Sequence, residues 1–165
     1  MHNRRCTTIV VDMDLDLVTA VHLGGIALIT ESMRRLQAAR YGDLRISHGY
    51  VVQHVVEGPR PVGEIATRMG VSQQAASKSV GELVELGYLE RIADPSDARL
   101  RLVGLSPRGR AAVEATRRIR AEIEAELAAV LTPSGAAALH HGALAVLDWA
   151  GAGSAVRDRR VREPR

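Results

Sequence analysis

The sequence predicts a mainly α-helical fold with a single β-hairpin. Apolar residues recur at three- and four-residue steps over most of the 165 positions, which is the period of an amphipathic helix. Aromatic residues make up only 2% of the chain and phenylalanine is absent, so the core must be aliphatic, as suits packed helices. Residues 88–106 instead hold two short apolar runs on either side of turn residues, the pattern of a hairpin.

Composition excludes several classes of protein. With 46% hydrophobic and 25% charged residues, a wholly disordered chain is ruled out. Cys6 is the only cysteine, so no internal disulfide framework exists. No apolar run approaches the ~20 residues that span a bilayer, and the apolar stub in residues 1–12 is too short for a signal peptide. We therefore expect a cytoplasmic protein that makes no membrane contact.

The charge distribution indicates an anionic partner bound near the middle of the chain. The net charge is +3, and the last nine residues hold five arginines against two acidic residues. Residues 60–110 carry eight basic and six acidic residues, whereas 12–57 and 111–156 are each net acidic. A basic middle between acidic flanks is a weak electrostatic sign of such a partner.

Residues 14–40 are predicted to form one long helix, with apolar side chains at three- and four-residue steps. Gly24 and Gly25 interrupt it, either as a kink or to let another backbone or a ligand approach closely, and we favour close packing. Tyr41-Gly42-Asp43 ends it. Residues 44–57 have the β-branched content of a strand, but their length and spacing favour a buried helix.

A helix-turn-helix pattern follows the break at residues 58–61. Residues 62–69 predict a short helix ended by Gly70 in the left-handed conformation. Ser72 is a ready N-cap for a second helix that runs to about Leu86 and is closed by Gly87. Two helices joined by a three-residue turn with glycine outline a helix-turn-helix.

The remaining segments predict a wing and two helices. Turn residues 93–98 join the two short apolar runs of the hairpin, which would form a two-stranded β-wing. Ser106-Pro107 then starts a long helix to about Leu131, and Thr132-Pro133 repeats that signal for a last helix to about Ala150. Residues 151–154 read as a flexible linker, and the basic tail beyond as disordered.

Three segments resemble MarR-type winged-helix regulators. Residues 62–91 resemble their helix-turn-helix, Asp94-Pro95-Ser96-Asp97-Ala98-Arg99 their wing, and Leu105-Ser106-Pro107-Arg108-Gly109 the start of their long dimerisation helix. The resemblance covers about residues 14–150. The chain departs at Ala98, where the family often has arginine, and at Gly49, where it usually has an aromatic residue.

The resemblance implies a mainly α winged helix-turn-helix homodimer that binds double-stranded DNA. It implies an arm (1–13), an N-terminal dimerisation helix (14–43), a DNA-binding region (44–106), C-terminal dimerisation helices (107–150) and a tail (151–165). It further implies a transcriptional regulator, by family default a repressor of a pseudo-palindromic operator, released by a small-molecule effector. Neither a cofactor nor a metal nor catalysis is expected, because no phosphate loop, nucleophile elbow or metal motif occurs.

The candidate DNA contacts lie on the second helix of the helix-turn-helix and on the wing. The first turns of that helix enter a major groove first, and glutamine pairs bidentately with adenine. A wing arginine enters a narrow minor groove, and a nearby carboxylate holds it in place. The predicted contact residues are Ser72, Gln73, Gln74, Ser77, Lys78, Arg99 and Arg101, with Asp97 as the residue that structures the wing.

Other interpretations stay open. In the family the first two helices help to line a cavity for small anionic aromatics, which makes His22, Arg34, His48 and Tyr50 candidate ligand contacts. Some relatives sense peroxide through an N-terminal cysteine, and Cys6 lies beside two arginines that would depress its pKa. A winged-helix enzyme or dimerisation module is the remaining alternative, since fold alone does not settle function.

Overall fold

The computed structural model describes residues 15–93 and 101–158, in two units, Met1–Glu31 and Ser32–Arg165. Helix α1, Leu17–Leu36, begins in the first unit and runs through Gly24 and Gly25. A Cβ added at either glycine would meet nothing within 4 Å. The helix therefore continues through both glycines without the alternative kink, and the preference for close approach of another backbone or a ligand stays a prediction.

In the second unit a π-helical turn and a short helix follow α1. The π-helical turn η1, Gln37–Tyr41, contains Arg40 in the left-handed region (φ 69°, ψ 26°). Helix α2, Ile46–Val52, confirms the preference for helix over strand but stops earlier than the predicted Glu57. Beyond Val52 the backbone bonds shorten to three-residue steps, as from the His54 N–H to the Val51 carbonyl, which converts the stretch into turns.

The helix-turn-helix forms as predicted. Helix α3 spans Val62–Met69 and α4 spans Gln73–Glu85. Gly70 has φ 66° and Gly87 has φ 77°, so both occupy the left-handed region that ends a helix. Ser72 caps α4 by accepting a hydrogen bond from the Ala75 N–H at 3.2 Å.

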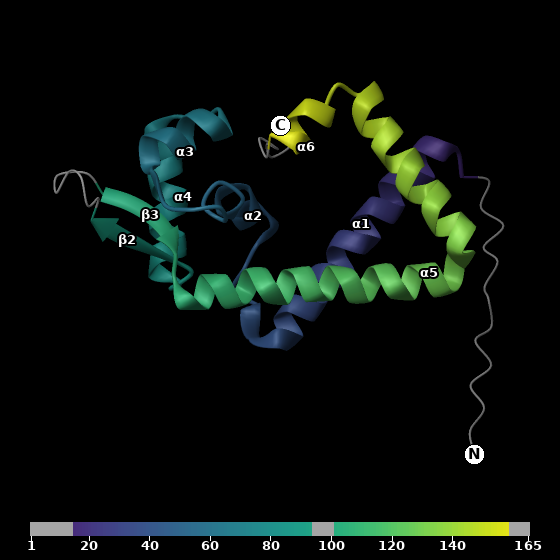
Figure 1. Cartoon of the computed structure of the whole chain (residues 1–165), viewed down its shortest axis with the longest axis horizontal. Helices are drawn as coiled ribbons and strands as arrows, with labels where there is room; N and C mark the ends of the chain where they lie inside the picture. Colours follow the sequence, from purple (N-terminus) through teal and green to yellow (C-terminus); the bar gives the residue numbers. More distant parts are fainter. Residues whose placement is uncertain (1–14, 94–100, 159–165) are drawn as a thin grey trace, which may run out of the picture. The chain divides into compact units, whose positions relative to one another are not determined.

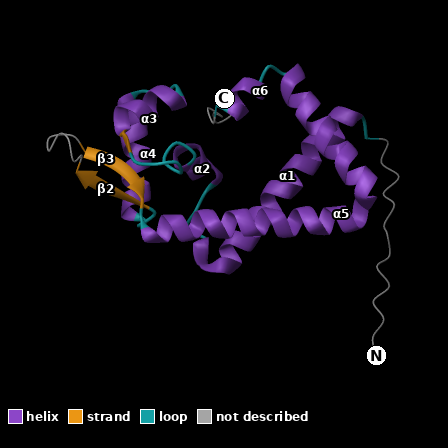
Figure 2. Cartoon of the chain, viewed as in Figure 1, coloured by secondary structure: helices purple, strands orange, loops and turns teal. Residues whose placement is uncertain are grey.

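The two-stranded wing forms as predicted and is part of a three-stranded antiparallel sheet. Strands β2, Leu89–Ala93, and β3, Arg101–Leu105, form the predicted antiparallel pair, with Leu89 opposite Leu105. The two-residue strand β1, Arg60–Pro61, pairs with the other edge of β3, where the sequence predicts only a break. Two residues are too short to show a strand period, and the missing N–H of Pro61 is tolerated at a sheet edge. Figure 2 shows this sheet as the one β element among helices.

Helix α5, Pro107–Trp149, contains the predicted interruption. Ser106 caps it by accepting the Gly109 N–H at 3.0 Å. Thr132 has non-helical dihedrals (φ 64°, ψ 158°), so two helices meet there, with Pro133 in the first turn of the second. Helix α6, Gly153–Arg157, corrects the predicted flexible linker and part of the predicted disordered tail, because residues 153–157 continue in helical turns. Residues 159–165 lie outside the described ranges.

Much of the apolar surface of α5, the long helix coloured from green to yellow in Figure 1, is exposed. Within the described residues, α5 is the one helix long and apolar enough to cross a membrane by length and composition, which alone is weak evidence. Its exposed large apolar side chains are Val130, Leu139, Leu144, Val146 and Trp149, the last 88% exposed.

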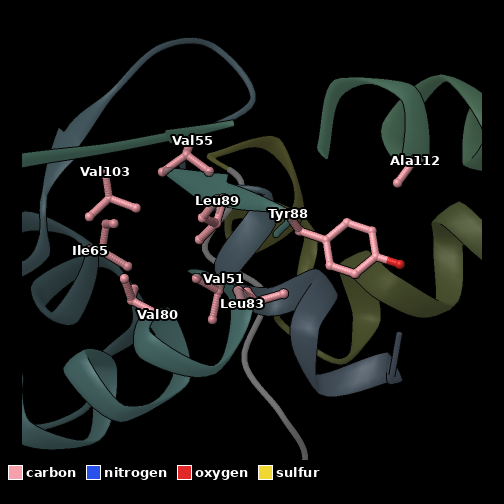
Figure 3. Close-up of a cluster of buried hydrophobic side chains, with 9 residues drawn as sticks. All are labelled: Val51, Val55, Ile65, Val80, Leu83, Tyr88, Leu89, Val103 and Ala112. Carbon is pink, nitrogen blue, oxygen red and sulfur yellow. The ribbon is translucent and has the colours of Figure 1, made fainter. Parts of the chain in front are cut away.

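The core of the winged helix is aliphatic with one tyrosine. Its buried members come from α2 and the turn after it, α3, α4, the wing and the start of α5, and Figure 3 shows them converging. They are Val51, Val55, Ile65, Val80, Leu83, Tyr88, Leu89, Val103 and Ala112. The inward face of α4 is formed by Ala76, Val80 and Leu83, each fully buried, and by the half-buried Val84.

Candidate nucleic-acid interface

The first turns of α4 present a polar, exposed surface. Ser72, Gln73, Gln74, Ser77 and Lys78 are all exposed. The first helical hydrogen bond runs from the Ala76 N–H to the Ser72 carbonyl, so helix geometry leaves the N–H groups of Gln73 and Gln74 without an intrahelical partner. These donors and the positive helix end favour an anionic group such as a phosphate.

Burial of one face of α4 fixes which side chains point outward. Ala76 is buried, and Gln74 lies about 160° around the helix from it. Lys78 is one turn further along the line of Gln74, whereas Gln73 shares a line with Ser77. An amide and an ammonium group are therefore at the centre of the outward face, with a second amide and a hydroxyl at its side.

The charge of Lys78 is available to a partner. Among the described residues, no carboxylate lies within ion-pair distance of its ammonium group. Glu82, the acidic residue one turn further along α4, instead binds the Arg45 guanidinium. This pairing satisfies the carboxylate that would otherwise compete for Lys78.

The wing residues are described only in part. Arg101 is exposed at the start of β3. Asp97 and Arg99 fall in residues 94–100, outside the described ranges, so their roles stay predictions, as does any role of Cys6 in residues 1–14.

The sequence of this region matches a known family. The MarR family matches over residues 43–100, which include α2, α3, α4, β2 and the wing turn. Residues 43–100 therefore resemble the MarR family. An HTH-type transcriptional regulator of Mycobacterium bovis is 35% identical to it over 78 residues, which are 47% of this chain and 54% of the relative. The chain thus matches about half the length of this curated relative.

Solved structures share the MarR-type fold. The structure of Streptococcus pneumoniae FabT in complex with DNA is 16% identical, with a TM-score of 0.62 over 80% of this chain and 94% of that one. Wild-type MarR from E. coli is 22% identical, with a TM-score of 0.59 over 82% and 99% of the two chains. At such identities the likeness concerns the fold alone.

A polar cluster links α4 to the start of α2. His48 is 3% exposed, and its Nδ1 accepts the Arg45 N–H at 3.1 Å. Arg45 and His48 both approach the Glu82 carboxylate, the imidazole at 3.7 Å. Burial and the charge of Arg45 lower the pKa of His48 despite the opposing pull of Glu82. Sequence spacing does not reveal this cluster, because Glu82 is far from the other two residues along the chain.

His54 is a second buried histidine in the winged helix. It is 2% exposed, and neither ring nitrogen has a hydrogen-bond partner among the described residues. Burial, then the charges of Arg68 and Arg60, lower its pKa. Arg60 donates to the His54 carbonyl at 2.7 Å and to Glu64 at 2.6 Å, and Arg68 binds Glu64 at 2.9 Å. The four-residue spacing of Arg60, Glu64 and Arg68 could have predicted the two ion pairs of Glu64, although not the hydrogen bond to His54.

The predicted ligand residues are divided between the two units. His22 is exposed on the first unit, and Arg34 is exposed near the end of α1. His48 is engaged with Arg45 and Glu82, and Tyr50 is half-buried, with its carbonyl bonded to the Gln53 side chain at 3.1 Å. Their role in ligand binding stays a prediction, and His48 has a structural role of its own.

Proposed function

We propose that the chain is a sequence-specific regulator of transcription that binds double-stranded DNA through α4. The observation that carries this proposal is the outward line of Gln74 and Lys78 at the capped N-terminus of α4, with Gln73 and Ser77 beside it. An amide that donates and accepts together matches the N6 and N7 pattern of adenine, and the ammonium group suits a phosphate. Arg99 and Arg101 would add wing contacts in the minor groove.

The proposed regulator acts as a homodimer. Support comes from apolar side chains that a single chain leaves in water, among them Val130, Leu139 and Trp149 on α5. A dimer would bring two copies of α4 to successive major grooves, ~34 Å apart, which suits a pseudo-palindromic operator. An interface above ~2,000 Å² is expected. A monodisperse monomer in sedimentation at micromolar concentration would contradict it.

We also propose that it represses in the cytoplasm and that a small, anionic aromatic ligand releases it from DNA. The resemblance to MarR-type regulators supports this. A ligand that changes the spacing of the two winged helices would lower DNA affinity. The test is a mobility shift on the DNA upstream of the chain's own gene, with a panel of phenolic acids added. No release by any member of the panel would remove the support for that ligand class.

The experiment that tests DNA recognition is selection of a duplex from a random pool by the full chain. Recovery of one palindromic sequence is expected, with affinity that falls steeply as salt rises because phosphate contacts release counterions. Recovery of no preferred sequence would contradict specific recognition. Equal affinity at all salt concentrations would contradict an electrostatic DNA interface.

A further inference from the structure

Three side chains from separate parts of the second unit meet in one polar cluster. Asp43 lies in the turn before α2, Tyr88 between α4 and β2, and Arg108 in the first turn of α5. The Tyr88 hydroxyl donates to Asp43 Oδ1, and Arg108 Nη2 donates to Asp43 Oδ2 at 2.8 Å. Arg108 Nη2 also lies 3.1 Å from the Tyr88 hydroxyl, and the guanidinium covers the Tyr88 ring at 4.3 Å.

Tyr88 is held in place both by burial of its ring and by hydrogen bonding of its backbone. Its side chain is 1% exposed, and Figure 3 shows the ring extending from the aliphatic core with its hydroxyl at the far end. Its carbonyl accepts the Ser106 N–H at 3.0 Å, and the Ser106 hydroxyl donates to the Gly87 carbonyl at 2.5 Å. The start of α5 is thus held against the end of the helix-turn-helix by backbone contacts.

Arg108 extends this attachment to both neighbours. Its Nη1 donates to the Leu86 carbonyl at 2.6 Å, immediately after α4 ends, while its Nη2 binds Asp43. The hydrogen bond from Tyr88 and the charge of Arg108 lower the pKa of Asp43, so the carboxylate stays ionised near neutral pH. One guanidinium therefore links the end of α4 and the turn before α2 to α5.

The cluster is at the opposite end of α4 from the proposed DNA contacts. Helix α4 has 13 residues, so about 20 Å separate its two ends. A small rotation about the cluster would therefore be amplified at Gln73 and Gln74. The side chains of the cluster would therefore affect DNA binding by orienting α4 and not by contacting DNA themselves.

We propose that Asp43, Tyr88 and Arg108 form the joint that holds the winged helix in one orientation on α5, and thereby set the half-site spacing that the dimer accepts. This inference rests on the proposed DNA-binding function. With the joint intact, α4 of each copy has one direction relative to the dimer helices. Without it, the winged helix samples several directions, and operators of neighbouring spacing become acceptable.

The test uses the duplex that the full-length wild-type chain selects, together with duplexes whose half-sites are moved apart or together one base pair at a time. Tyr88→Phe removes only the hydroxyl. Arg108→Leu removes the hydrogen bonds from α5 to Leu86, Tyr88 and Asp43. In both variants, the ratio of the affinity for the selected duplex to the affinity for duplexes of neighbouring spacing should fall about ten-fold. The salt slope on the selected duplex should stay unchanged. Arg108→Lys, which keeps the charge beside Asp43, should restore part of the discrimination.

Arg117→Leu is the matched control, because Arg117 pairs with Glu114 on α5 itself and has no hydrogen bond or ion pair to another element in residues 15–93 and 101–158. It should keep the wild-type spacing preference. Thermal unfolding identifies variants that fail to fold, and Tyr88→Phe, the mildest change, then decides. A wild-type spacing preference in folded Tyr88→Phe and Arg108→Leu would overturn the joint. A uniform loss of affinity with a reduced salt slope would also overturn it, by making Arg108 a phosphate contact. If the wild-type chain selects no duplex, the proposed function fails instead.

Discussion

The carbonyl of Tyr88 lies against Gly109 so closely that a Cβ on residue 109 would be 2.0 Å from the oxygen. The obstacle is backbone, which cannot move aside as the end of a flexible side chain can, and Leu105 Cδ2 would also lie 3.2 Å from the added Cβ. Gly109→Ala should therefore lower the free energy of unfolding by about 3 kcal/mol. Urea unfolding at one fixed protein concentration measures this.

Gly142→Ala is the control for that substitution, since it lies on the same helix and its Cβ would meet nothing within 4 Å. Helix propensity alone should make it neutral or stabilising by up to about 1 kcal/mol. Equal effects of the two substitutions would contradict the close approach of Gly109 and Tyr88.

His54→Leu should stabilise the protein. The imidazole is buried with both nitrogens unpartnered, so an apolar side chain of similar size removes an unsatisfied polar group, by about 1 kcal/mol at neutral pH. Thermal or urea unfolding checks it. His140→Asn, at an exposed position, is the control and should change little.

The same histidine predicts a pH dependence. Because the pKa of His54 is lowered in the fold from its usual 6.5, the unfolded chain takes up the proton first as pH falls. The free energy of unfolding should have its full value above pH 6.5 and should fall as the pH decreases from 6.5 towards the lowered pKa of His54. In His54→Leu the decline should be shallower, and His48, whose pKa is also lowered, should account for part of what remains. An identical decline in wild type and variant would show that His54 does not contribute.

Gln74 should read a base, and Gln73 should contribute mainly to phosphate binding. Gln74 is opposite the buried face of α4, whereas Gln73 is rotated by roughly 100° from Gln74 around the helix. Gln74→Ala should cost ~1–3 kcal/mol at one operator position and little elsewhere. A position-by-position operator scan measures this, with Glu85→Gln, at the other end of α4, as control. If neither glutamine substitution relaxes any position, specificity comes from Ser77, the wing or DNA shape.

Lys78→Ala should weaken binding to all sequences alike. The ammonium group has no ion pair among the described residues and suits a phosphate, so its loss should reduce the salt slope by roughly one unit. Binding titrations across salt concentrations test this against Arg117→Ala on α5. A changed base preference would assign Lys78 to base reading.

Features specified by neighbouring residues could be predicted from the sequence. Gly70, Ser72 and Gly87 set the bounds of α4 through dihedral freedom and a side-chain cap, and Ser106 does the same for α5. The exposure of Gln74 and Lys78 follows from the apolar stripe of the same helix. All of these depend on contacts within about one helical turn.

Features that depend on distant residues could not. Strand β1 exists because Arg60 is opposite Val103, a partner that no local pattern names. The Asp43–Tyr88–Arg108 cluster likewise joins positions that only the tertiary fold brings together. The early end of α2 is a further case, because residues 53–57 keep the apolar spacing of a helix while their backbone bonds form turns.

The exposure of Trp149 has a practical consequence. It is the only tryptophan in the 165 residues and is 88% exposed at the end of α5, while the winged helix contains none. Its fluorescence therefore reports on this end of α5 alone and is free of tryptophan signal from α4. A shift of emission to shorter wavelength as protein concentration rises would register subunit association without any label. The same emission, followed during a DNA titration, would show whether events at α4 reach the far end of α5.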